Sequence, residues 1–130
     1  MATLRARNIE ATFLFGPLAG TDSATYVQFT KDGTVLLRSE LVVMDFDVSE
    51  LGNGLLDVAE QRATQTRVEI TDGDFILEAE RLESPGDVSV RFWHGEPYML
   101  MRGYRFVVRS ADLREFASEL IAEATRRRLS

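Results

Sequence analysis

The C-terminal segment that begins at Ser110 has apolar residues at helical spacing. They recur every three or four positions, at Leu113, Phe116, Ala117, Leu120, Ile121 and Ala124. Serine is a favoured N-cap, and Asp112 in the first turn and the arginines of the last turn suit the helix dipole. We therefore predict a long C-terminal helix, capped by Ser110, with one buried face.

Most of the preceding chain alternates apolar and polar residues with the two-residue period of half-buried strands. The predicted strands are 9–15, a hairpin over 25–38, 41–46, a hairpin over 66–82, 88–92 and 98–109. Between the two hairpins, Asp47 with Glu50 forms a capping-box pattern. This pattern predicts a short middle helix that starts at Asp47, with a buried stripe at Leu51, Leu55, Val58 and Ala59.

The turn residues of the two hairpins predict their registers. The Asp72-Gly73 turn pairs Ile70 with Phe75. In the first hairpin, a three-residue loop with a left-handed glycine sets Phe29 opposite Val35. Both registers place apolar residues opposite one another on the buried face.

Glycines inside the predicted elements indicate weak or irregular points. Gly52 and Gly54 each weaken the middle helix by about 1 kcal/mol relative to alanine. Gly103 predicts a β-bulge in the last strand.

Together these patterns predict a single α+β domain over residues 1–130, without an internal repeat. Its centre is a mostly antiparallel sheet of about seven strands. A short middle helix and a long C-terminal helix are expected to pack on one face of this sheet.

The composition limits the chemistry that the chain can carry. A chain of 130 residues with 45% hydrophobic residues can bury its own core. The absence of cysteine excludes disulfides, thiolate metal sites and cysteine nucleophiles, and it fits a reducing compartment. With neither a signal-peptide pattern nor a membrane segment in the sequence, we expect a cytoplasmic protein.

The net charge of −6 points to a class of partner. It opposes general affinity for nucleic-acid phosphates or an anionic membrane surface. A basic protein is therefore the expected macromolecular partner, with no nucleic acid and no membrane.

No residue is predicted to be catalytic, metal-binding or cofactor-binding. His94 is the single histidine, and it lies beside turn residues. Three carboxylate pairs are explained by a helix start, a hairpin turn and a solvated strand face, in that order: Asp45 with Asp47, Asp72 with Asp74, and Glu78 with Glu80. Gly52-Asn53-Gly54 lacks the strand, third glycine and lysine of a phosphate-binding loop.

The segment around the last predicted turn contains more apolar residues than one strand face can bury. Either it is covered on both faces, or one side is an exposed patch for a partner or a second copy. The candidate partner surface consists of Trp93, Tyr98, Met99, Met101 and Tyr104.

The layout from Tyr26 onward resembles small bacterial immunity-type domains, a group of unknown function that accompanies polymorphic toxins. Three segments carry the resemblance: Asp45-Phe46-Asp47 leading into 51–59, Gly86-Asp87-Val88-Ser89-Val90-Arg91-Phe92, and Arg109-Ser110-Ala111-Asp112-Leu113-Arg114-Glu115-Phe116. It implies an inhibitory protein-binding role and carries over no functional residue.

Three functions remain open from the sequence. The first is a non-enzymatic protein-binding domain, immunity-like or regulatory, with an acidic surface. The second is a small-molecule binder or enzyme, with a pocket between the C-terminal helix and the sheet where Tyr98, Tyr104, His94 and a carboxylate converge. The third is a homodimer joined through an edge strand in the region 98–109.

Overall fold

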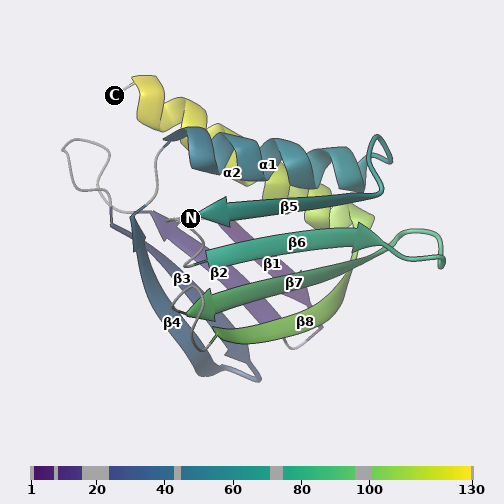
Figure 1. The fold of residues 1–130 in the computed structure, drawn as a ribbon, viewed down its shortest axis with the longest axis horizontal. Coiled ribbons are helices and arrows are strands. Elements are labelled where there is room, and N and C mark those ends of the chain that lie inside the picture. Colours follow the sequence, from purple (N-terminus) through teal and green to yellow (C-terminus); the bar gives the residue numbers. More distant parts are fainter. Residues whose placement is uncertain are drawn as a thin grey trace.

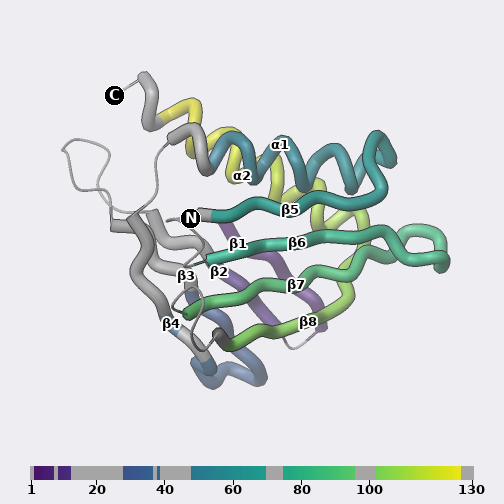
Figure 2. The backbone as a smooth tube through the Cα atoms, in the orientation of Figure 1, coloured from purple at the N-terminus to yellow at the C-terminus, as the bar shows by residue number. Residues whose placement is uncertain are grey.

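The computed structural model describes residues 2–7, 9–15, 24–42, 45–70, 75–95 and 101–129. The chain path is drawn in Figure 1 and Figure 2. The elements are β1 Ala2–Ala6, β2 Ile9–Phe15, β3 Ala24–Lys31, β4 Thr34–Val42, α1 Asp45–Ala59, β5 Gln65–Ile70, β6 Phe75–Arg81, β7 Asp87–Gly95, β8 Met101–Arg109 and α2 Ser110–Leu129.

The strands form two antiparallel sheets of four strands each, in the orders β1-β2-β3-β4 and β5-β6-β7-β8. The α+β class is confirmed, but the prediction of one sheet of about seven strands is wrong. A two-residue period identifies a strand but does not say which sheet it joins. The period also missed the short β1 and divided β4 at Ser39 into two strands.

The chain consists of two halves with the same order of elements, each a four-stranded meander followed by a helix. The helix of each half lies against the first strand of the other half, so that α1 contacts β5 and α2 contacts β1. The two helices also pack on each other, along the β5 side of the molecule (Figure 1). This structural repeat was not visible as a repeat in the sequence.

The two sheets are joined face to face by aromatic rings. The Phe29 ring of β3 lies 5.0 Å from Phe92, 4.6 Å from Tyr104 and 5.6 Å from Phe106, centroid to centroid. Phe92, Tyr104 and Phe106 belong to β7 and β8. The inward-facing residues of the two sheets therefore share one core, as in other sheet-on-sheet packings.

The predicted apolar face of α2 is buried, but it does not lie mainly on the sheet. Leu113, Phe116 and Leu120 are fully buried, and the face packs chiefly against α1. At Gly52 of α1 an added Cβ would lie 2.8 Å from Ile121 Cγ1 and 3.1 Å from the Ala117 carbonyl oxygen. The glycine that was expected to weaken α1 thus lets the two helices approach closely.

The second hairpin has the predicted register, with Ile70 opposite Phe75. The predicted register of the first hairpin is wrong. Asp32 and Gly33 have positive φ angles of 53° and 79° and form a two-residue turn of type I′. An extra residue at Leu36 then makes a β-bulge, which sets Phe29 opposite Leu37.

Gly103 does not mark a bulge, because β7 and β8 pair in continuous register through it. A Cβ at Gly103 would overlap the ring of Trp93, which lies directly opposite on β7. This glycine is needed for the close approach of an aromatic ring to the backbone.

The predicted N-cap at Ser110 is also corrected. The helix includes Ser110, whose backbone N–H donates to the Gly86 carbonyl oxygen at 2.8 Å. Its hydroxyl oxygen is buried, and no hydrogen-bond partner for it lies within the described part of the chain. The serine side chain therefore supplies no cap here.

We expect Gly52→Ala to lower the free energy of unfolding. Crowding against α2 costs about 1–3 kcal/mol, more than the gain in helix propensity of about 1 kcal/mol. Urea unfolding measures the difference. The matched control is Asn53→Ala on the exposed face of the same helix, which is expected to be neutral or stabilising. A stabilised Gly52→Ala variant would contradict the close helix contact.

We expect Ser110→Ala to leave the free energy of unfolding unchanged or to raise it by up to about 1 kcal/mol, because it removes a buried hydroxyl without a partner. A capping serine would instead lose about 1 kcal/mol on this change. Thermal unfolding separates the two outcomes. Ser118→Ala on the exposed face of α2 controls for helix propensity.

Candidate functional site: a groove along the edge strand β8

β8 is an edge strand, because it pairs with β7 on one side and no other strand of the described chain pairs with it. Tyr104, Phe106 and Val108 alternate along it and face inward. The edge position that the dimer hypothesis required of this region is thus confirmed. An edge strand carries a row of backbone donors and acceptors that the sheet itself does not use.

A groove of about 840 Å³ runs along β8. One wall consists of five consecutive residues of β8, from Arg105 to Arg109. The opposite wall comes from the first sheet, where Ala6, Arg7 and Ile9 surround the β1–β2 corner and Lys31 ends β3. In Figure 1 β1 and β2 pass behind the C-terminal half of β8, and β1 and β8 are in contact.

The five β8 residues show that the groove follows the strand's backbone. Side chains alternate along a strand, so five in succession line one groove only where it runs along the edge. Phe106 and Val108 face inward and are buried, whereas Val107 is 47% exposed. The groove therefore presents one exposed apolar side chain in the middle of a backbone edge.

The charge of the groove is opposite to that of the whole chain. Its lining has four cationic side chains, Arg7, Lys31, Arg105 and Arg109, all of them exposed. It has two carboxylates, of which the half-buried Asp87 lies in register with Arg109 and the exposed Asp112 lies in the first turn of α2. The groove is thus a cationic region on a chain of net charge −6.

Rigid elements hold these cations in place. Arg105 Nε donates a hydrogen bond of 2.8 Å to Oγ of the buried Ser89 on β7. Arg7 has a φ of 56°, which turns the chain sharply between β1 and β2. Among the described residues, Arg7, Lys31 and Arg109 form no ion pair, so their charges face solvent in the groove.

The residues of the predicted partner surface are not all brought together. Trp93 lies on the outer face of the second sheet, half-buried over Gly103, whereas Tyr104 faces inward and stacks on Phe29. Met101 begins β8. Tyr98 and Met99 lie outside the described residues. The partner surface as a set stays a prediction.

The candidate chemical residues have structural surroundings. His94 lies in β7 opposite Phe75 and Arg102. Glu78 faces outward, with carboxylate oxygens 3.6 Å from Arg67 Nε and 3.9 Å from Arg91 Nη1. Asp72 and Asp74 lie outside the described residues, as do the side chains of Asp45 and Asp47. Within the described ranges no three metal-ligating side chains are grouped.

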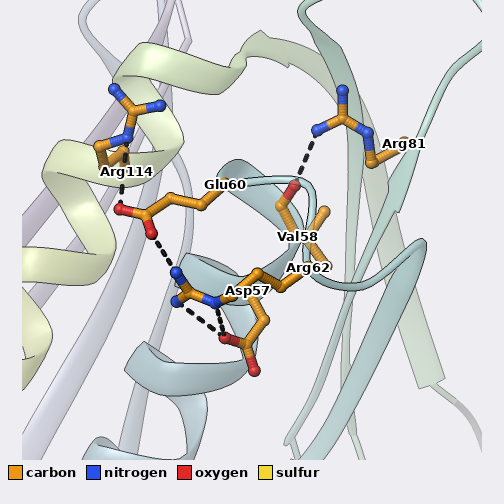
Figure 3. Close-up of polar contacts among 6 residues, drawn as sticks. All are labelled: Asp57, Val58, Glu60, Arg62, Arg81 and Arg114. Atoms are coloured by element: carbon orange, nitrogen blue, oxygen red, sulfur yellow. Dashed lines mark hydrogen bonds and ion pairs between the residues drawn. The ribbon is translucent and has the colours of Figure 1, made fainter.

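A second polar cluster closes the C-terminal end of α1 (Figure 3). Arg62 Nε donates to Asp57 Oδ1 at 2.9 Å, and Arg62 also pairs with Glu60. These hydrogen bonds to two carboxylates raise the pKa of the Arg62 guanidinium. Glu60 also reaches Arg114 of α2, with 3.7 Å between Oε1 and Nε. The cluster satisfies its own charges and ties the two helices together, so we interpret it as structural.

The small-molecule hypothesis from the sequence places a pocket between α2 and the sheet. Leu113, Phe116, Ala117, Leu120 and Ala124 on the inward face of α2 are fully buried, and the groove lining includes only Asp112 from this helix. Tyr104 points into the core, while His94 and Asp112 lie at opposite ends of the β7–β8 pair. Tyr98 lies outside the described residues, so the predicted convergence of Tyr98, Tyr104, His94 and a carboxylate stays a prediction, as does the small-molecule hypothesis.

Sequence reasoning missed the wall of the groove that comes from the first sheet. Residues 1–8 were not predicted to form a strand, because only Ala2 and Leu4 carry the apolar alternation. Arg7 and Lys31 are 24 positions apart and meet β8 only in the folded chain. Their contribution could not be found from spacing.

No protein-family model and no curated protein matches the chain. The resemblance to immunity-type domains stays a prediction. No helix in the described ranges has the length and apolar character needed to cross a membrane.

Proposed function

We propose that this chain is a non-enzymatic protein-binding domain that recognises its partner along the free edge of β8. The groove that follows residues 105–109 is the observation that carries the proposal. A regular strand edge beside a groove is a surface to which another polypeptide adds by backbone hydrogen bonds. The register between β7 and β8 is unbroken, so no bulge interrupts this edge.

The outer face next to the edge supports the same function. Trp93 lies beside Ile76 of β6, and both are half-buried. Val107 adds an exposed apolar side chain at the edge itself. Aromatic and aliphatic side chains with arginines around them are typical of the centre of a protein interface.

An immunity-like or regulatory role is the form of this function that we propose. The lack of cysteine supports a cytoplasmic setting. The net charge of −6 supports a partner with a basic surface, which would be steered toward the domain from a distance. Once the partner is close, the local charge of the groove and the unpaired backbone groups of β8 determine which part of it binds there.

The test is selection of binders from a library of displayed, unstructured peptides. We expect the selection to yield peptides that bind the unaltered chain but not the Val107→Lys variant, because this change places a charge in the middle of the edge. Val35→Lys is the matched control, since Val35 is a similarly exposed valine, 50% exposed, in β4 of the other sheet. A selection without enriched peptides, or with binders unaffected by Val107→Lys, would overturn the proposal.

A further inference from the structure

We infer that the polypeptide bound at β8 is an extended acidic segment, which joins the second sheet as a fifth strand. This inference rests on the proposed function and adds the chemistry of the partner. It is based on the four cationic side chains that lie beside the strand edge. The net charge of the chain is −6, so its composition does not predict a cationic groove.

The spacing along β8 predicts a motif in the partner. Arg105, Val107 and Arg109 lie on one face of β8, because side chains of a strand alternate. The two arginines are four residues apart, about 13 Å along a strand. A strand paired with β8 presents residues at the same spacing. We therefore expect an acidic residue opposite each arginine and an apolar residue opposite Val107.

The opposite wall adds to this selection. Arg7 and Lys31 face the groove from the first sheet, so a bound strand lies between cations on both sides. Asp87 lies beside Arg109 and reduces the positive charge at that end, and Asp112 does so at the start of α2. Arg105 lies opposite Arg91, not opposite a carboxylate. The acidic residue opposite Arg105 is thus expected to contribute most.

A second copy of this chain is the less suitable occupant. Antiparallel pairing of two β8 strands centred on Val107 would set Arg105 of each copy opposite Arg109 of the other. Like charges directly opposite one another destabilise a strand pair. The arginines therefore act against self-pairing through β8 in this register and favour an acidic strand.

The experiment uses the whole chain and a capped heptapeptide with glutamates at its second and sixth positions, a central valine and threonines elsewhere. We expect fluorescence anisotropy to detect binding that weakens as salt is added. Chemical shift changes should fall on the amides of 105–109. A peptide with lysines in place of the glutamates should bind at least about tenfold more weakly, because it meets repulsion instead of attraction.

One variant, with a matched control, tests the arginine positions. Arg109→Glu should weaken binding of the acidic peptide by about tenfold, and a peptide with lysine in the facing position should restore it. Arg102→Glu, an exposed arginine of β8 outside the groove lining, is the matched control and should bind normally. Methylation of the peptide's backbone nitrogens on the edge that pairs with β8 should abolish binding, because these N–H groups form the inter-strand hydrogen bonds.

The outcomes separate the inference from the function on which it rests. Peptides that require Val107 but are basic or neutral would overturn the acidic character of the segment bound at β8 and leave the protein-binding function intact. Acidic peptides that bind equally well after nitrogen methylation would overturn strand addition. If the acidic peptide does not bind, the arginines only protect the edge from pairing, and the inference fails. If no peptide loses binding in the Val107→Lys variant, both the acidic segment and the protein-binding function are overturned.

Discussion

The packing of Phe29 against the second sheet is the interaction on which the rest of this structure depends. Phe29 meets Phe92 edge to face and stacks on Tyr104, so one side chain of β3 is fixed by two strands of the other sheet. Such ring pairs add about 0.5–1.5 kcal/mol beyond the burial of their area. This contact joins β3 to the second sheet, and β1 also contacts β8, so the two walls of the groove lie beside each other.

The helices lie chiefly against the edge strands β1 and β5, so β8 is one available edge and β4 of the first sheet is another. Each helix crosses to the first strand of the other half, and the two helices meet at Gly52. They therefore lie along the side of the molecule where β5 is found, at the far end of the second sheet from β8 (Figure 1). The covered side provides the core, and the uncovered strand provides the surface that we propose for binding.

Local features were predicted from the sequence much better than long-range ones. The bounds of β2, the register of β5 with β6 and the buried face of α2 followed from period and turn residues, because these are set by neighbours in the chain. The sheet partition depends on contacts between distant segments, and the bulge at Leu36 and the role of Gly103 depend on how particular side chains pack across a strand pair. Apolar alternation contains no information on those contacts. The groove, built from four separate segments of the chain, could not be predicted for the same reason.

The central claim is that β8 has one side paired with β7 and one side open to the groove. Residue-resolved amide hydrogen exchange of the free protein tests it directly. In an antiparallel edge strand, alternate N–H groups face the neighbouring strand and the others face outward. The account predicts alternating slow and fast exchange from Arg105 to Arg109. Uniformly slow exchange across these residues would contradict it, because it would mean that the edge is already paired.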